Sequence, residues 1–417
     1  MKSLENSARP EGLLDWDTDV FIAGGGPAGL AAAIAARAKG FRVMVADPAE
    51  PPVDKACGEG LPPDSLAALR ALGIGFDPDL SAPIVGIRFV GCKASVQASF
   101  PSGLGAGVRR TILHRLLAAR AEEAGVTLLW GRRVTGLSGH SVKLLRNSRK
   151  TGTGSSVPPD ELAGSSPVWG HAAVPFALDS ETIRSQWIIG ADGQGSRIRQ
   201  WAGLDRKRRE SFRFGFRRHY RMPPWSEFVE VHWGDECQFY VTPIGCREVC
   251  VALISRDSHH RIDDVLDGFP ELQRRLRGVE FTSQERGAIS ASRSLHRVTR
   301  GPVALIGDAS GSVDAITGDG IYLALRQSAA LAESLADGCL ATYQASHSQF
   351  RRGPVLIEQM LLLLDRSPWL RKRVLRALAN NPAIFERMVA MHSGEPSHAE
   401  FALDAILPLG WRLLQSR

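Results

Sequence analysis

The sequence lacks the features of a membrane-spanning, secreted or disulfide-stapled protein. It has no stretch of about 18 consecutive apolar residues, and its N-terminus shows no charged, then apolar, then small-residue pattern, so we expect neither a spanning helix nor a signal peptide. The six cysteines include no C-x-x-C pair and stand singly, which is not typical of a disulfide scaffold or a zinc site. Free thiols favour a reducing compartment, so we expect a cytoplasmic protein without a metal.

A strong charge of one sign is also lacking. The 51 lysines and arginines against 44 aspartates and glutamates leave a net charge of +7, a weak field for 417 residues. No basic cluster with interleaved aromatic residues appears, so we expect no nucleic-acid partner. No Ser/His/Asp constellation supports hydrolytic chemistry. What is present is a chain of 44% hydrophobic residues, long enough for two large domains or for one domain with an appendage.

A strand, a glycine turn and a helix form the first clear motif. The apolar run 19–23 predicts a parallel strand buried on both faces, and the alanine-rich segment after the glycine turn predicts a helix that ends at Gly40. A second apolar strand, 42–46, ends at Asp47. This order indicates a βαβ unit.

The glycine turn fits the pattern G-x-G-x-x-G. Gly24 permits a tight turn, Gly26 lets the backbone approach a pyrophosphate, and Gly29 lets the helix pack against the strand. The free N–H groups at the start of the helix then face the phosphates. Asp47 can accept hydrogen bonds from a ribose. The turn therefore predicts a dinucleotide site, and a purely structural glycine turn is the alternative.

Further glycine-aspartate turns follow later strands. The run 186–190 leads to Asp192, and the run 303–307 leads to Asp308. A turn at 318–320 opens an apolar helix that we expect from residue 321 to about 335. Each turn places a carboxylate and bare backbone where open α/β sheets bind ligands. Together they exceed what one nicotinamide needs.

The order and spacing of these motifs, from about residue 17 to 340, resemble the FAD-dependent enzymes of the para-hydroxybenzoate hydroxylase and geranylgeranyl reductase superfamily, which includes the group A flavin monooxygenases. The resemblance implies an α/β fold with a Rossmann-type FAD-binding domain, an antiparallel β-sheet substrate domain and a C-terminal helical tail. The motifs that carry it are Gly24-x-Gly26-x-x-Gly29 with Asp47, Lys55-Ala-Cys57-Gly58-Glu59-Gly60, Arg110-x-x-Leu113-x-x-x-Leu117, Gly190-Ala-Asp192-Gly193, and Gly307-Asp308 with Gly318-Asp319-Gly320.

The same resemblance implies that the FAD-binding domain is assembled from separate parts of the chain. A Gly-, Ser- and Pro-rich insert at about 145–176, which we expect to be mobile, interrupts the second part. The expected division is 1–83, 105–205 and 291–345 for the FAD-binding domain, 84–104 and 206–290 for the substrate domain, and 346–417 for the helical tail.

The resemblance also implies a role in FAD binding for individual residues of this sequence. It implies that Asp47 holds the adenosine ribose and that Arg110 lies along the ribityl-pyrophosphate stretch. It also implies that Asp308 either hydrogen-bonds the ribityl chain or contacts the pyrophosphate through water. The 318–320 turn would place N–H groups near the pyrimidine edge of the isoalloxazine. NADPH or NADH is the implied electron donor. The implied FAD-binding residues are Gly24, Gly26, Ala28, Gly29, Asp47, Lys55, Gly58, Arg110, Asp192, Asp308, Gly318 and Gly320.

The loop 55–60 is the most discriminating local feature. In the resembled enzymes it crosses the flavin, where hydroxylases often carry Arg-rich sequence and geranylgeranyl reductases carry a Cys-Gly-Gly type of sequence. Lys55 could pair with phosphate or polarise a flavin oxygen. Cys57 is either a small apolar filler or a thiol near the ring. These two residues are the candidate catalytic side chains.

Period-2 alternation in 84–100 and 211–254 predicts the sheet that roofs the substrate pocket. The phenylalanines of 212–216 lie on one face of a strand and Arg213 and Arg217 on the other. We expect these arginines to face solvent rather than to bind an anionic substrate. The candidate substrate residues are His232, Tyr240 and Pro243.

The tail combines an apolar segment, 356–364, with a basic amphipathic segment that begins at Trp369. One interpretation is a helical bundle that caps the core. The other is a face that admits a lipophilic substrate from a membrane surface. We expect a small hydrophobic organic substrate, with peripheral membrane contact through these helices as an open alternative.

The sequence favours a monooxygenase that uses FAD, NAD(P)H and O₂ to hydroxylate a hydrophobic molecule of aromatic, polyketide or isoprenoid type. The run 239–243 lacks the Tyr-x-Trp-x-Phe-Pro pattern of the reductases, which supports this hypothesis. Cys57-Gly58 and the 318–320 turn favour the alternative, an FAD-dependent reductase of isoprenoid double bonds. A non-catalytic FAD-binding sensor is a second alternative.

Overall fold

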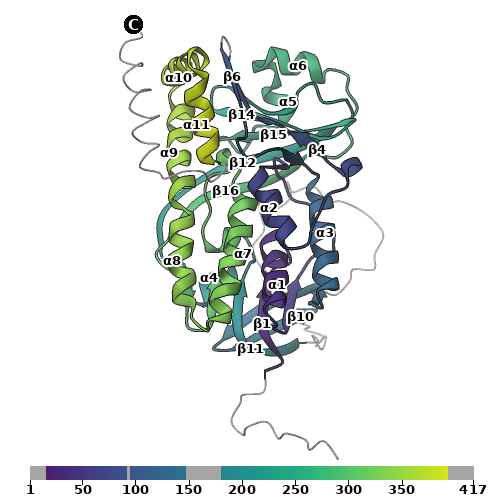
Figure 1. The fold of residues 1–417 in the computed structure, drawn as a ribbon, viewed down its shortest axis with the longest axis vertical. Helices are drawn as coiled ribbons and strands as arrows, with labels where there is room; N and C mark the ends of the chain where they lie inside the picture. The colour runs from purple at the N-terminus through teal and green to yellow at the C-terminus, as the bar shows by residue number, and fades with distance from the viewer. Residues whose placement is uncertain (1–15, 92–93, 147–179, 393–417) are drawn as a thin grey trace, which may run out of the picture.

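The computed structural model describes residues 16–91, 94–146 and 180–392 (Figure 1). The insert expected at 145–176 lies outside the described residues from residue 147 onward. Two sheets lie at opposite ends of the long axis of the molecule, and a column of C-terminal helices runs along one side (Figure 1).

A mostly parallel sheet forms the first end. Its central strands follow the order β17-β18-β11-β1-β2-β8, in which β1 pairs in parallel with both β2 and β11. The strands β9 and β10 extend it in antiparallel fashion. Their bounds are β1 Thr18–Ala23, β2 Val43–Asp47, β8 Thr127–Trp130, β9 Arg132–Ser138, β10 Ser141–Arg146, β11 Ser180–Gly190, β17 Thr299–Arg300 and β18 Val303–Leu305.

Helices cover this sheet and complete the core that the βαβ pattern predicts. Phe21, Ile188 and Leu305 of three adjacent strands are fully buried. The alanine-rich α1 contacts both α3 and α7, because small side chains let helices approach closely. The helices of this part are α1 Pro27–Ala38, α2 Pro63–Ala71, α3 Arg110–Glu123, α4 Arg197–Trp201 and α7 Gly320–Ala336.

The second sheet has the order β16-β12-β15-β14-β13-β5-β6. It is antiparallel except where β13 pairs in parallel with β5, the strand that arrives from the 84–104 segment. The strand β16 continues through residue 290, where we placed a domain boundary. The bounds are β5 Gly86–Val90, β6 Ser95–Ser99, β12 Lys207–Tyr220, β13 Phe228–Trp233, β14 Cys237–Gly245, β15 Glu248–Ser255 and β16 Arg286–Leu295.

A three-stranded sheet, two short helices and several 3-10 turns accompany the two larger sheets. A small sheet of β3, β7 and β4 contacts β14 of the second sheet, and α5 and α6 flank the second sheet (Figure 1). Their bounds are β3 Gly60–Leu61, β4 Ala82–Ile84, β7 Gly105–Gly107, α5 Ile262–Val265 and α6 Pro270–Leu276, with 3-10 turns η1 Pro78–Leu80, η2 Leu266–Gly268, η3 Gly307–Ser310 and η4 Ala315–Thr317.

The described part of the tail is helical and packs on the second sheet. Leu361, Leu375 and Phe385 share a buried apolar cluster with Phe89 of β5 and Val231 of β13. The helices are α8 Leu340–Phe350, α9 Arg352–Arg366, α10 Pro368–Asn380 and α11 Pro382–His392. This agrees with a bundle that caps the core.

The expectation that Arg213 and Arg217 face solvent is wrong. Their relative exposures are 3% and 1%, whereas their neighbour Phe212 is 55% exposed. Arg213 donates from Nε to Asp314 Oδ2 at 2.9 Å and from Nη2 to Asp365 Oδ2 at 2.8 Å. Burial opposes the charge of Arg213, yet the attraction of both carboxylates leaves its pKa raised. Strand β12 therefore turns its arginines inward because distant carboxylates neutralise them.

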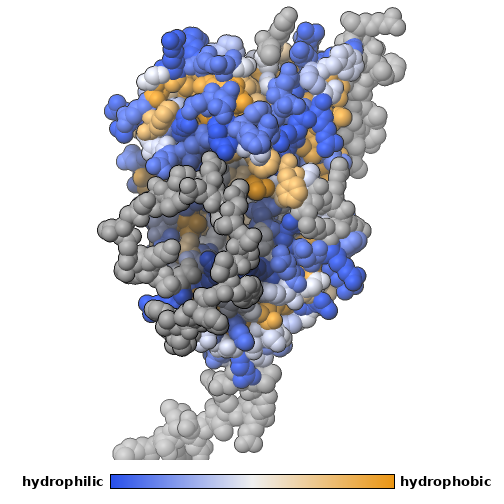
Figure 2. Space-filling view, turned by 180° about the vertical axis from the view of Figure 1, so that it is seen from behind, coloured by the Kyte–Doolittle hydropathy of each residue, from blue (hydrophilic) through white to orange (hydrophobic). Residues whose placement is uncertain are grey.

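The opposite face of the molecule is mainly hydrophilic, with hydrophobic residues gathered in its upper part and a hollow near its middle (Figure 2). Within the described residues, no helix is both long enough and apolar enough to span a membrane.

The buried ion pairs of Arg213 lead to a prediction for stability. Arg213→Met should lower the free energy of unfolding by roughly 3 kcal/mol or more, because it leaves the buried Asp314 without its cation and leaves the buried Asp365 with Arg256 alone. Phe212→Ala, one position away on the exposed face, should cost only about 1 kcal/mol or less. Urea unfolding of both variants measures the difference. Equal small losses would contradict the inward placement of Arg213.

Candidate functional site

One cavity of about 780 Å³ lies between the two sheets. It brings together the glycine turns, the 55–60 loop and the inner faces of the C-terminal helices, segments that are far apart in the sequence. Of the residues expected to bind FAD, those that line the cavity are Gly24, Gly26, Ala28, Asp47, Lys55, Gly58, Arg110, Asp192, Asp308, Gly318 and Gly320.

The three glycines of the turn after β1 have different roles, as the G-x-G-x-x-G pattern predicts. Gly24 has φ +112°, and a Cβ there would lie 2.3 Å from the backbone oxygen of Ala191. A Cβ on Gly29 would lie 1.9 Å from the oxygen of Gly24, so this glycine serves packing and does not line the cavity. A Cβ on Gly26 would meet no atom within 4 Å. The backbone of Gly26 is therefore bare toward the cavity.

Asp47 is held at the end of β2 by its own neighbours. Its Oδ2 accepts the N–H of Gly25 at 2.7 Å, and its Oδ1 accepts the N–H of Ala49 at 2.8 Å. A Cβ on Gly25 would lie 2.4 Å from the ring of Trp130. The carboxylate is thus oriented at the cavity wall, and each oxygen keeps a lone pair for a further donor.

Buried polar atoms at the cavity wall fit a polar, phosphate-bearing cofactor. Within the described residues, Arg110 Nε and Asp192 Oδ1 are buried without a hydrogen-bond partner. The other oxygen of Asp192 accepts the N–H of Arg197 at 2.8 Å. Such atoms are normally satisfied, and a bound dinucleotide supplies acceptors and donors of the required kind. With bare backbone at Gly26, these residues fit FAD.

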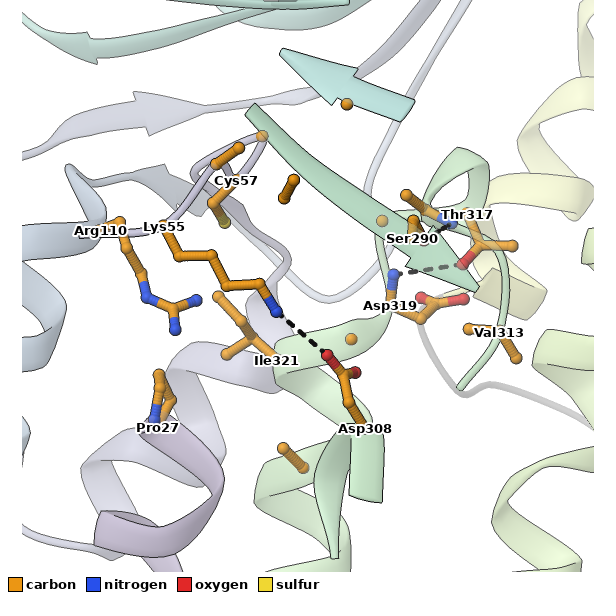
Figure 3. A pocket seen from close by; sticks show the side chains of 18 of the residues that line it. Pro27, Lys55, Cys57, Arg110, Ser290, Asp308, Val313, Thr317, Asp319 and Ile321 are labelled. Carbon is orange, nitrogen blue, oxygen red and sulfur yellow. Dashed lines mark hydrogen bonds and ion pairs between the residues drawn. The ribbon is translucent and has the colours of Figure 1, made fainter. Parts of the chain in front are cut away.

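Lys55 and Asp308 face one another across the cavity (Figure 3). Their Nζ and Oδ2 atoms lie 3.4 Å apart, and both side chains are partly exposed. Asp308 belongs to η3, whose first N–H, that of Gly307, donates to Gln327 of α7 at 2.7 Å. The helix α7 then begins at Gly320, so its N-terminal N–H groups also border the cavity.

The 57–59 loop is held by hydrogen bonds to each of its carbonyl oxygens. The oxygen of Gly58 accepts Thr242 Oγ1–H at 2.7 Å, and that of Cys57 accepts the thiol of Cys250 at 3.7 Å. The third, that of Glu59, accepts the N–H of Val108 at 2.9 Å. Burial raises the pKa of the Cys250 thiol, which keeps its proton for this contact. The loop is therefore fixed between β14, β15 and the start of α3.

Beyond this loop the cavity continues as an apolar chamber. The hydroxyl of Tyr240 lies in its wall but donates to the oxygen of Ile316 at 2.7 Å, and burial raises the pKa of this phenol. The sulfur of Cys57 borders the same space (Figure 3). Sheet, loop and helix contribute the chamber's aliphatic and aromatic side chains, namely Ile84, Ile87, Phe89, Phe100, Val229, Val231, Ile316, Ile357, Met360, Leu361, Phe385, Met388 and Val389.

Of the three expected substrate residues, only Tyr240 lines the cavity. His232 Nε2 instead lies 3.0 Å from Glu230 Oε2. Burial alone would raise the pKa of Glu230, but hydrogen bonds from His232 and Trp225 help to lower it to about 2. Pro243 packs against the backbone of Gly107, where a Cβ would lie 1.6 Å from the proline oxygen.

Several residues that line the cavity are not predicted from the sequence. Ile357 and Met360 of α9 and Phe385 of α11 line it, although the tail was treated as lying beyond the site. Their signal in the sequence is only an apolar periodicity, which also suits core packing. Glu59 and Arg217 line it as well, and nothing local in the sequence distinguishes these side chains from ordinary charged residues.

Comparisons with known proteins agree with this geometry. The FAD binding domain family matches residues 17–289. The menaquinone reductase of Mycolicibacterium smegmatis is 25% identical over 373 residues, which cover 83% of this chain and 84% of that protein. The digeranylgeranylglycerophospholipid reductase of Methanocaldococcus jannaschii is 24% identical over 323 residues, with 74% of each chain covered.

Solved structures share the fold. A flavoprotein/dehydrogenase from Cytophaga hutchinsonii superposes with a TM-score of 0.71 at 18% sequence identity, covering 95% of this chain and 96% of the other. At this level of identity the likeness concerns the fold alone.

The bare backbone at Gly26 yields a prediction that separates binding from folding. Gly26→Val should abolish FAD binding, because the side chain would fill the space that a pyrophosphate needs. The variant should still fold, since its Cβ meets nothing within 4 Å and its φ of −72° suits any residue. Flavin absorbance after purification and a thermal melt measure the two properties.

Gly29→Val is the matched control. Its Cβ would overlap the oxygen of Gly24 at 1.9 Å, so this variant should fail to fold rather than fold without flavin. A Gly26→Val protein that keeps its yellow colour would contradict the assignment of the pyrophosphate site.

Proposed function

The chain belongs to the FAD binding domain family and is an FAD-dependent oxidoreductase, and from this premise we propose that it reduces a carbon–carbon double bond of a lipophilic, isoprenoid-type substrate. The observation that carries the proposal is the apolar chamber that opens from the Cys57 loop. Two curated relatives that align over most of their own length are named as reductases, one of menaquinone and one of digeranylgeranylglycerophospholipid, which supports the same choice.

The lining of the chamber suits a hydrocarbon better than a phenol. An aromatic hydroxylase needs a polar group to orient its substrate's hydroxyl. Here the hydroxyl of Tyr240 is already engaged by Ile316, and that of Thr242 is engaged by Gly58. Aliphatic and aromatic side chains make up most of the remaining wall, so binding would rest on burial of apolar surface.

The proposed chemistry adds a hydride and a proton across the double bond. Bound, reduced FAD supplies the hydride. Cys57 would hold the proton at Sγ, deliver it to the second alkene carbon and recover it from solvent. The N–H of Glu59 donates to this sulfur at 3.4 Å, which fixes the position of the thiol. We propose NADPH or NADH as the source of the electrons.

Monooxygenation remains the second candidate. The run 239–243 lacks the reductase pattern Tyr-x-Trp-x-Phe-Pro, and this departure is the observation that favours it. In that reaction Cys57 would only fill space beside the flavin. The two reactions differ in their need for O₂ and in their product, which gains two hydrogens in one and an oxygen atom in the other.

Cys57→Ser separates these reactions. With prenylated quinone or prenyl phospholipid and NAD(P)H, the wild type should form the reduced product without O₂. The variant should lower kcat by about 10²-fold, because serine keeps the shape but is a much weaker acid. Anaerobic product mass and turnover are the measurements.

Cys246→Ser is the matched control, since Cys246 is an exposed free thiol in the turn between β14 and β15. It should turn over at the wild-type rate. Strict dependence on O₂, with an oxygenated product and an active Cys57→Ser variant, would overturn the reductase in favour of the monooxygenase.

We also propose that the corner between α9 and α10 lies against an anionic membrane surface. Trp369 and Leu363 are 64% and 56% exposed there. The exposed charges from 363 to 380 belong to Arg366, Lys372 and Arg376, and the single acid of this range, Asp365, is buried. Exposed tryptophan among cations is typical of helices that rest in the lipid interface.

This surface can be tested with vesicles. The protein should sediment with phosphatidylglycerol vesicles at low salt, and less with phosphatidylcholine vesicles or at high salt. The triple variant Trp369→Ser, Lys372→Ser, Arg376→Ser should weaken binding by about tenfold or more, because each lost cation contributes roughly 1 kcal/mol.

A second triple variant removes one tryptophan and two positive charges elsewhere. Trp201→Ser, Arg206→Ser, Arg297→Ser alters exposed residues away from α9 and α10 and should leave vesicle binding unchanged. Equal loss in both triple variants would show that net charge, rather than this corner, governs binding.

A further inference from the structure

Glu59 occupies a backbone conformation that favours glycine. Its φ is +60°, and within the described residues the only other non-glycine residue with positive φ is Glu236, at +67°. The two differ in burial, because Glu59 is 2% exposed whereas the side chain of Glu236 is 65% exposed. Left-handed backbone and the burial of a carboxyl group each cost free energy, so Glu59 needs contacts that compensate for the two costs.

The carboxylate of Glu59 has such contacts on both oxygens. Its Oε1 accepts the backbone N–H of Arg110, the first residue of α3, at 2.9 Å. Its Oε2 lies 2.7 Å from His219 Nε2. Arg217 Nε lies 3.8 Å from Oε1 and supplies a positive charge. One side chain therefore joins the 57–59 loop to α3 and to β12.

The direction of the histidine contact follows from its other neighbour. Arg217 Nη1 lies 3.3 Å from His219 Nδ1, and a guanidinium can only donate. Nδ1 is therefore the acceptor, and Nε2 carries the proton that it donates to Glu59. Arg217 also pairs with Asp54, three residues before Cys57, the first residue of the loop.

This cluster does not suit a metal ion. Atoms of Glu59, His219 and Cys250 lie within 4.8 Å of one another. A cation among them would meet the guanidinium of Arg217, and His219 Nε2 and the Cys250 thiol already donate to protein oxygens. The polar atoms of the cluster are instead engaged with one another and with the backbone.

We propose that Glu59 is a positioning residue whose buried carboxylate locks the Cys57 loop and the first turn of α3 to each other. Cys57 and Arg110 line the cavity from these two segments, so the lock sets where the thiol and the guanidinium stand relative to FAD. The inference rests on FAD binding alone and is independent of which substrate is transformed.

Glu59→Gly is the decisive variant, because glycine adopts the left-handed backbone without strain, so the variant loses the side chain and its carboxylate contacts without added backbone strain. We expect FAD affinity to fall by about tenfold and Cys57 to react with iodoacetamide about tenfold faster in the flavin-free protein. Fluorescence quenching measures the affinity, and mass spectrometry of the Cys57 peptide measures alkylation separately from other thiols.

Glu236→Gly is the matched control. This variant makes the same substitution at a residue that also has positive φ. The side chain of Glu236 is exposed, however, and its ion pair with Arg256, at 3.8 Å, lies at the surface. It should leave both FAD affinity and Cys57 alkylation unchanged. If Glu59→Gly behaves like Glu236→Gly in both measurements, Glu59 has no positioning role.

Glu59→Gln serves if the glycine variant does not fold. Its carbonyl can still accept from Arg110, but its amide nitrogen cannot accept from His219, so we expect smaller changes in the same directions. Wild-type values in this variant would overturn the proposal. Because neither measurement uses a substrate, a failure of the proposed reductase activity leaves this test intact.

Discussion

The close approach of bare backbone at the ends of β1, β11 and β18 is the constraint on which the structure depends. Gly24 and Gly29 leave no room for a Cβ, since one there would overlap backbone oxygens at 2.3 and 1.9 Å. This contact seats α1 against the sheet and directs its first N–H groups into the cavity. The turn at Asp308 and the start of α7 then border the same space. The cavity stays open at the glycine turn after β1 because Gly26 has no side chain to fill it.

The cavity has two chemically different halves, and the 57–59 loop lies at their border. On one side are bare glycine backbone and the polar groups of Asp47 and Arg110, which suit phosphate and ribose. On the other side are aliphatic and aromatic side chains from the second sheet and from α9 and α11. In the proposed reaction, a thiol at this border would contact both cofactor and substrate. The fold alone does not choose a reaction, because oxygenases and reductases share it, so the choice rests on the side chains of the second half.

The parts that the sequence predicts well are those with local causes. The glycine turns, the βαβ unit and the helix after 318–320 follow from residues within a few positions of one another, and the structure has them at α1 Pro27–Ala38 and α7 Gly320–Ala336. The parts it misses depend on distant partners. Arg213 turns inward because Asp314 and Asp365 meet it, and alternation along β12 carries no information about those carboxylates. Likewise, an apolar stripe on α9 cannot reveal whether it faces a core or a cavity.

The C-terminal helices connect the two proposed roles physically. The inner faces of α9 and α11 build the apolar chamber, while the corner between α9 and α10 exposes Trp369 beside cations. The transfer of a lipophilic chain from a bilayer into such a chamber costs little free energy, because both environments are apolar. Its crossing of water would be the costly step, and contact between this corner and the membrane shortens that crossing. In the proposed function, the helices that cap the second sheet would therefore also select the molecules that reach Cys57.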